Sequence, residues 1–197
     1  MSDTPIILIA YPEEWACYSK LARKLTKVLI KQTSFKVIYP HDKQGLLLNR
    51  FYTQDQRVVS IESGIFDANV SIDYAMIFDD GVSFEILKSN LNQFGCQLRT
   101  NTVAVTRVVN IDSKASYDVY IGRCSGFGNP YAIGVEGDDR DEVIRKFQYD
   151  FDRGFLRDNF KQRLLVHQGK ILGCHCKPLP CHGDILANFL NCYDDGL

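Results

Sequence analysis

The sequence predicts an α/β protein with a mostly parallel, Rossmann-like sheet that includes at least one antiparallel strand pair. Short apolar, β-branched segments alternate with segments in which apolar residues recur every three or four positions, as in alternating strands and helices. The 197 residues are enough for one domain or for two small ones. Two strand-like segments in the second half are separated by only five residues, which are too few for a parallel crossover.

The first half of the chain contains four predicted strands and two predicted helices. The first helix begins at Pro12, because proline suits the first turn of a helix and Glu13 and Glu14 favour its positive end. Apart from one strand, residues 41–71 show no clear pattern. The predicted strands cover residues 5–10, 35–40, 57–62 and 72–78, and the second helix covers about residues 83–93.

The chain continues with strands predicted over residues 102–111 and 117–122, joined by the turn DSKAS. If these two strands pair, we expect them to pair antiparallel. Asp139 and Glu142 stand at capping-box spacing at the start of a helix that Gly154 ends. The remaining predicted elements are a helix over about 155–167, a strand over 170–176 and a final helix that begins at Cys181.

The chain is expected to consist of two halves. Residues 1–110 form an N-terminal α/β half, and residues 111–197 form a C-terminal α/β unit that carries a glycine-rich loop and a cluster of cysteines and histidines. No linker-like segment separates the halves, so they could also form one continuous domain.

The composition is that of an ordinary globular protein, and it excludes several functional classes. The net charge of −1 gives no overall field that would attract nucleic acid or anionic membranes. No apolar run approaches the roughly 18 residues that cross a bilayer, and the N-terminus lacks the layout of a signal peptide. We therefore expect a cytoplasmic protein with reduced thiols, whose clustered cysteines indicate metal binding or chemistry more than disulfides.

The first predicted helix has one strongly basic face. Such a face could contact the phosphates of a nucleic acid, although the neutral overall charge favours an ordinary solvated helix surface. The basic residues are Lys20, Arg23, Lys24, Lys27 and Lys31.

The glycine-rich loop IGRCSGFGNPY (121–131) follows a predicted strand. In open α/β sheets, ligands bind beyond the carboxyl ends of the strands. Gly126 and Gly128 allow close approach of the backbone to a ligand. Arg123 can bind a phosphate or carboxylate with two hydrogen bonds, and Asn129 can hydrogen-bond a base, a ribose or an amide. The loop matches no standard phosphate-binding motif, so a structural turn with Arg123 in a salt bridge is an equal alternative.

The segment GCHCKPLPCHGD (173–184) holds three of the seven cysteines and two of the four histidines. On a strand, residues two apart share a face, so Cys174 and Cys176 point one way and His175 points the other way. Cys181 opens the final helix, where the positive end of the helix would lower the pKa of its thiol.

Three interpretations of this cluster stay open. The first is a zinc site in which Cys174, Cys176 and Cys181 are joined by His182 or His175. The second is a reactive thiol, with Cys181 or Cys176 as the nucleophile and His182 or Asp184 assisting it. In the third, Cys174 and Cys176 pack as small apolar residues in a buried strand.

Residues 117–191 resemble a small uncharacterised domain family of bacteria and their phages, known as a domain of unknown function. The family is marked by an I-G-R-x-S-x-x-G-N-P-F/Y element and a terminal G-C-x-C-x-P-x-x-C-H-G/A-D element. Cys124 departs from the pattern, in which proline is more frequent. The resemblance implies no activity, and it places the protein in the host cytoplasm if it is phage-encoded. The shared signature covers Arg123, Ser125, Gly128, Asn129, Cys174, Cys176, Cys181, His182 and Asp184.

Residues 1–110 lie outside this resemblance and look like a nucleotide-handling region at the level of fold alone. Together, these observations predict that the protein binds or processes a nucleotide, nucleoside or related phosphorylated small ligand. The site would lie between the 122–130 loop and the 174–184 segment, and whether the protein is an enzyme stays open.

Roles follow for the residues of this predicted site. The ligand would be bound by Arg123, Ser125, Gly128, Asn129 and Lys177. Catalysis would fall to Cys181, His182 and Asp184. A zinc ion would be held by Cys174, Cys176, Cys181 and His182.

Two alternatives belong to other functional classes. In one, the cysteines form a structural zinc site, and the protein is an interaction module for nucleic acid or a partner protein. In the other, the protein works through a redox-active or nucleophilic cysteine.

Overall fold

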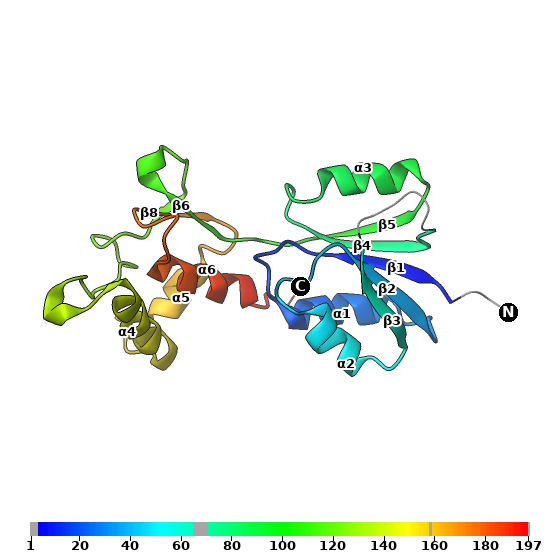
Figure 1. The fold of residues 1–197 in the computed structure, drawn as a ribbon, viewed down its shortest axis with the longest axis horizontal. Helices are drawn as coiled ribbons and strands as arrows, with labels where there is room; N and C mark the ends of the chain where they lie inside the picture. Colours follow the sequence, from blue (N-terminus) through cyan, green and yellow to red (C-terminus); the bar gives the residue numbers. More distant parts are fainter. Residues whose placement is uncertain (1–3, 65–70, 158, 197) are drawn as a thin grey trace. The chain divides into compact units, whose positions relative to one another are not determined.

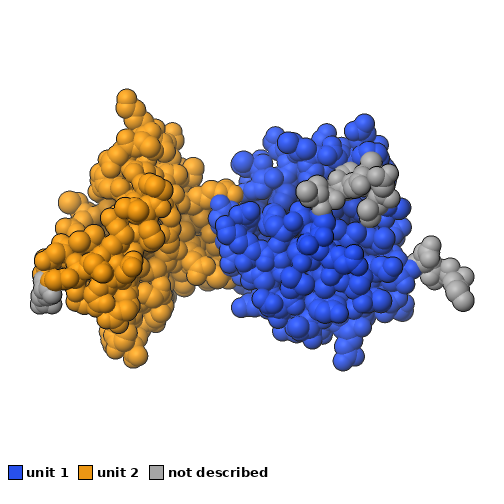
Figure 2. Space-filling model, in the orientation of Figure 1, with its two compact units in different colours: residues 1–103, 194–197 blue, residues 104–193 orange. Residues whose placement is uncertain are grey.

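The computed structural model describes residues 4–64, 71–157 and 159–196. It divides the chain into two compact units, coloured blue and orange in Figure 2. Unit 1 comprises residues 1–103 and 194–197, and unit 2 comprises residues 104–193. Within the segment 41–71, which has no clear sequence pattern, residues 65–70 lie outside the described part of the chain.

Unit 1 is a five-stranded, fully parallel sheet in the order β3-β2-β1-β4-β5. The order reverses between β1 and β4, as in Rossmann-like folds. The α/β class and the mostly parallel sheet are thus confirmed. The strands are β1 (Ile6–Ala10), β2 (Phe35–Tyr39), β3 (Val58–Ser63), β4 (Tyr74–Asp79) and β5 (Gln97–Thr102).

Helices cover both faces of this sheet, with α3 on one face and α1 and α2 on the other (Figure 1). Strands β1 and β4 are apolar and buried along nearly their whole length, so both faces of the sheet contribute to a core. The helices are α1 (Tyr18–Val28), α2 (Tyr52–Gln54), which follows a π-helical turn (Leu47–Phe51), and α3 (Glu85–Gln93). The core beneath α3 contains Leu8, Ala10, Ala75, Ile77, Phe84 and Leu91.

Helix α1 begins six residues later than the sequence predicted, at Tyr18 rather than Pro12. The backbone N–H of Trp15 donates to the carbonyl of Pro12 at 3.0 Å and closes a turn. The indole of Trp15 then stacks on Phe78 of β4, with ring centroids 4.9 Å apart. Burial of this aromatic pair against the sheet outweighs the local helix-start signals of Pro12, Glu13 and Glu14.

Unit 2 contains a three-stranded sheet in the order β6-β8-β7, and β8 is parallel to both neighbours. The predicted antiparallel pair is therefore wrong. The two early strands are not neighbours, because β8 inserts between them. Strand β7 begins at Val119, later than the sequence predicted. The connection 111–118 is therefore longer than the predicted turn, and it places β7 on the far side of β8. The strands are β6 (Arg107–Asn110), β7 (Val119–Tyr120) and β8 (Ile171–Cys174).

The predicted strand over 102–111 is also wrong, because it is split between the units. β5 ends at Thr102, β6 begins at Arg107, and the division of the chain falls between them. The buried side chain of Asn191 accepts a hydrogen bond from Thr106 N at 2.7 Å and donates one to Thr106 O at 3.0 Å. The backbone polar groups of Thr106 are thus satisfied by a helix side chain instead of a neighbouring strand.

Helix α6 packs on the small sheet of unit 2, and α4 and α5 pack against α6 around a core rich in phenylalanine. The carboxylate of Asp139 accepts a hydrogen bond from Glu142 N at 2.9 Å, which confirms the predicted cap of α4. Gly154, with φ of 72°, ends this helix as predicted. The helices are α4 (Arg140–Arg153), α5 (Phe160–Leu165) and α6 (His182–Cys192). The core includes Phe147, Phe151, Phe160, Leu164, Leu172, Leu186 and Leu190.

None of the helices in the described part of the chain is long and apolar enough to cross a membrane.

Candidate functional site

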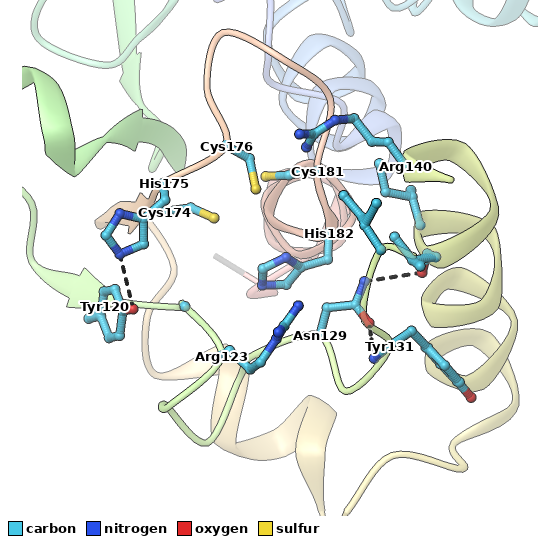
Figure 3. A pocket seen from close by; sticks show the side chains of 14 residues that line it. Tyr120, Arg123, Asn129, Tyr131, Arg140, Cys174, His175, Cys176, Cys181 and His182 are labelled. Atoms are coloured by element: carbon cyan, nitrogen blue, oxygen red, sulfur yellow. Dashed lines mark hydrogen bonds between the residues drawn. The ribbon is translucent and has the colours of Figure 1, made fainter. Parts of the chain in front are cut away.

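A cavity of about 270 Å³ lies in unit 2, where β7 and β8 end and α4 and α6 begin (Figure 3). Its wall has a thiol part, a basic part and an apolar part. Among the residues that the structure describes, no Asp or Glu lines it. The three parts are the thiols of Cys174, Cys176 and Cys181, the guanidinium groups of Arg123 and Arg140, and the side chains of Tyr120, Tyr131, Ile133, Val143 and Ile144.

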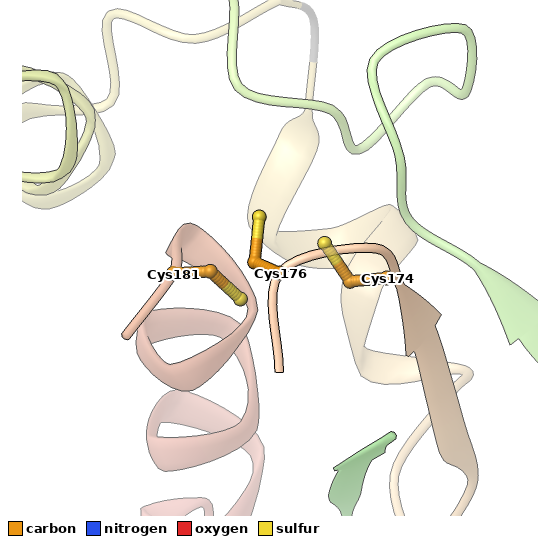
Figure 4. A group of neighbouring side chains, drawn as sticks. All are labelled: Cys174, Cys176 and Cys181. Carbon is orange, nitrogen blue, oxygen red and sulfur yellow. The ribbon is translucent and has the colours of Figure 1, made fainter. Parts of the chain in front are cut away.

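The three thiols of the cavity lie within 4.8 Å of one another. Cys174 is the last residue of β8, Cys176 lies in the following loop and Cys181 immediately precedes α6 (Figure 4). A tetrahedral zinc ion bound to sulfur at about 2.3 Å holds its sulfur ligands about 3.8 Å apart. The cluster therefore needs only a small contraction, and these thiols could hold a metal ion.

Cys174 and Cys181 are almost fully buried, and their thiols hydrogen-bond to each other. The Cys181 thiol stabilises the Cys174 thiolate and lowers the pKa of Cys174 to about 5. The same hydrogen bond, together with burial, raises the pKa of Cys181. The sequence predicted a lowered pKa for Cys181, which is wrong. The backbone N–H of Gly183 at the start of the helix does lower it, but the bond to Cys174 outweighs this effect.

Arg140 is a residue of the site that the sequence did not indicate. It is the first residue of α4, and its guanidinium hydrogen-bonds to the Cys176 thiol and to the carbonyl of Pro180 at 3.3 Å. The hydrogen bond to the thiol and the charge of Arg140 lower the pKa of Cys176, although burial and the Cys174 thiolate raise it more. Capping-box spacing located the start of this helix, but nothing in the local sequence linked it to the cysteine segment.

The two histidines of the segment have different places. His182 is buried, lines the cavity and lies with Nε2 2.8 Å from the carbonyl oxygen of Ile121. Burial lowers the pKa of His182, so the ring is neutral and donates from Nε2. His182 lies outside the thiol cluster. His175 is exposed and also lines the cavity, with Nδ1 2.9 Å from Asp112 and Nε2 3.3 Å from the Tyr120 hydroxyl.

Lys177 and Asp184 form an ion pair with each other, and neither lines the cavity. The Asp184 carboxylate also accepts a hydrogen bond from Cys181 N at 2.9 Å. This bond completes a capping box at the start of α6. The pair thus positions Cys181, and the roles predicted for Lys177 in ligand binding and for Asp184 in catalysis stay predictions.

The glycine-rich loop is held close to itself and to α4. A Cβ on Gly128 would lie 2.5 Å from the carbonyl oxygen of Gly122, so only glycine fits there. Asn129 lines the cavity, donates to the Val143 carbonyl at 3.1 Å and accepts from Tyr131 N at 2.9 Å. Its amide therefore fixes the loop beside the cavity.

Two other residues of the loop differ in their position relative to the cavity. Arg123 is exposed and points into the cavity in Figure 3. Ser125 lies outside this cavity, and its hydroxyl accepts a hydrogen bond from Phe127 N at 3.1 Å.

The basic face of α1 is partly used within unit 1. Lys20 is buried and forms an ion pair with Asp195 at 2.7 Å. Arg23 binds Asp194 through both nitrogens, at 2.8 and 2.9 Å. Lys24 is half-buried, and Lys27 and Lys31 are exposed. Nucleic-acid binding by this face stays a prediction.

The fold and the site define a protein of two α/β units, one Rossmann-like and one that carries the thiol cavity. Residues 4–109 match the family model described as the minimal SLOG domain, more than half of the chain, and the chain belongs to that family. SLOG-like domains are associated with the binding or processing of nucleotide-related ligands. Residues 104–192 match a second family model, described as domain of unknown function (DUF4326).

One curated protein is similar to part of the chain. The chain is 41% identical over 86 residues to an uncharacterized 12.4 kDa protein in the nrdA-td intergenic region of Enterobacteria phage T4. The alignment covers 43% of this chain and 77% of the relative. The expected resemblance to a small phage and bacterial domain of unknown function is therefore confirmed. No solved structure matches the chain.

Proposed function

We propose that unit 2 binds and processes a nucleotide-related phosphorylated ligand in the 270 Å³ cavity, beside a zinc ion held by Cys174, Cys176 and Cys181. The observation that carries this proposal is the composition of one wall. Three clustered thiols and two arginines face the same cavity, and no described carboxylate lines it.

The choice of zinc follows from the ligand atoms. Thiolates are soft ligands that select zinc, copper(I) or iron–sulfur clusters, and zinc accepts them in tetrahedral geometry. Zinc sites with three protein ligands keep a fourth position for water or substrate and are typical of enzymes. Such a zinc ion would supply Lewis-acid chemistry where the ligand binds.

No further side chain in the described part of the chain joins the three thiols, so the fourth coordination position of the zinc ion would face the cavity. His182 does not belong to the group of ligand atoms that lie within 4.8 Å of one another, and Nδ1 of His175 lies 2.9 Å from Asp112. Arg140 already hydrogen-bonds to Cys176, so its charge stabilises a thiolate at the cluster. We therefore assign three protein ligands to the metal.

The remaining wall fits the two chemical parts of a nucleotide. Tyr131, Ile133 and Ile144 offer an apolar surface for a base. Arg123 and Arg140 offer charged donors for a phosphate, which guanidinium groups bind with paired hydrogen bonds. The volume lies near the lower end of the roughly 300–1,000 Å³ range of ligand pockets, which favours a small ligand.

Ligand binding tests this proposal directly. Titration calorimetry with the common nucleoside monophosphates should detect binding to the full-length protein. Arg123→Gln should weaken that binding by about 10- to 100-fold, because it removes a charge-assisted hydrogen bond to phosphate. Arg145→Gln is the matched control, since Arg145 pairs with Glu142 at 2.6 Å and does not line the cavity.

The outcome that contradicts the proposal is equally direct. If no monophosphate binds, or if Arg123→Gln and Arg145→Gln bind equally well, the cavity is not a phosphate-ligand site.

A further inference from the structure

A second cavity, also of about 270 Å³, lies against the same glycine-rich loop and shares Arg123 with the first. Its polar groups are the guanidinium groups of Arg123 and Arg157 and the residue Ser125. Arg157 comes from the connection between α4 and α5. No described Asp or Glu lines this cavity.

Arg163 of α5 brings a third guanidinium group to the same loop. Its Nη2 atom lies 2.4 Å from the place that a Cβ on Gly126 would take, so glycine at this position leaves room for it. The guanidinium also lies over the ring of Phe127, with its central carbon 5.3 Å from the ring centroid. Packing against the ring thus holds Arg163 beside the loop.

Three like charges gathered in this way repel one another unless an anion neutralises them. In the described part of the chain, no acidic side chain forms a salt bridge with Arg123, Arg157 or Arg163. Arginine is suited to phosphate, because its planar group offers several donors in a fixed geometry. The chemistry of the second cavity is therefore that of a phosphate site.

We infer that the second cavity binds the second phosphoryl group of a nucleotide that carries at least two. Arg123 lines both cavities, and the five N–H donors of a guanidinium allow it to contact two neighbouring phosphoryl groups. This inference rests on the proposed function, because the first phosphoryl group lies in the first cavity. It narrows the ligand class from phosphorylated nucleosides in general to nucleoside diphosphates and larger relatives.

The test compares nucleoside mono- and diphosphates of the same base on the full-length protein by titration calorimetry. Wild type should bind the diphosphate at least about tenfold more tightly, through added charge-assisted hydrogen bonds. Arg157→Gln should abolish this gain and leave monophosphate affinity unchanged. Arg153→Gln is the control, since it removes the same charge from a side chain that lies over Tyr149, 4.3 Å from the ring.

The outcomes separate the two proposals. If the monophosphate binds but the second phosphoryl group adds nothing, or if its gain survives Arg157→Gln, this inference is overturned and the proposed function stands. An equal loss in Arg157→Gln and Arg153→Gln also overturns it, because the effect would then be one of overall charge. If no nucleotide binds at all, the proposed function fails and this inference fails with it.

Discussion

Cys174 and Cys181 are both buried, but the hydrogen bond between their thiols shifts their pKa values in opposite directions. The sequence located both cysteines at the site, because three cysteines and two histidines within a few residues are unusual. It assigned the lower pKa to the wrong one, because the contact between β8 and the start of α6 is tertiary. The contribution of Arg140 could not be predicted from the sequence either, because its contact with Cys176 is also tertiary.

His167 gives a prediction for the effect of pH on unit 2. Burial and Lys170 lower its pKa, its Nδ1 has no partner in the described structure, and its ring packs edge-on against Phe127 at 5.3 Å. The unfolded chain therefore takes up this proton more readily than the folded chain does. The free energy of unfolding should fall as the pH drops through the unfolded value of about 6.5.

Urea unfolding at pH 7.5 and pH 5.5, followed through NMR signals of unit 2, measures this effect. In His167→Gln the difference between the two pH values should be smaller than in wild type. His175→Gln is the control, since His175 is exposed and lies beside Asp112. An unchanged pH dependence in His167→Gln would count against the account.

At the scale of elements, the sequence predicted individual strands better than their pairing. The strands of unit 1 follow from apolar, β-branched runs, and β1 to β4 lie where these runs predicted them. The order of the strands in unit 2 could not be predicted, because β6 and β7 each pair with β8, which is distant from both in sequence. Likewise, the β-branched residues at 102–111 predicted one continuous strand. The break between β5 and β6 could not be predicted, because the side chain that binds Thr106 belongs to the distant helix α6.

Asn191 of α6 supplies a prediction at this scale. It is 3% exposed, and its amide satisfies both the N–H and the carbonyl of Thr106. Asn191→Ala leaves these buried groups unpaired and should lower the free energy of unfolding of unit 2 by about 1–3 kcal/mol. Asn188→Ala, an exposed position on the same helix, should change it by less than about 0.5 kcal/mol. Denaturation of both variants checks this, and equal stabilities would refute the assigned role.

At the scale of the whole molecule, the two units correspond to the two family matches. The division between the units at residues 103 and 104 coincides with the start of the second match at residue 104. The association with nucleotide-related ligands belongs to the family of unit 1, whereas the thiol cavity lies in unit 2. The proposal for unit 2 is therefore supported by its own arginines, thiols and apolar wall.

The central claim is that Cys174, Cys176 and Cys181 hold one zinc ion whose fourth position faces the cavity. Elemental mass spectrometry of untagged, full-length protein purified without chelator tests it most directly. The variants are Cys176→Ser, which removes the least buried ligand, and Cys192→Ser, which removes an exposed thiol elsewhere in unit 2. His182→Ala is included to examine the fourth position.

The account predicts about one zinc ion per chain in wild type, Cys192→Ser and His182→Ala, and a clear loss in Cys176→Ser. Loss of zinc in His182→Ala would instead make His182 the fourth ligand and close the site. Wild-type protein without metal, or a Cys176→Ser variant that retains its zinc, would contradict the claim.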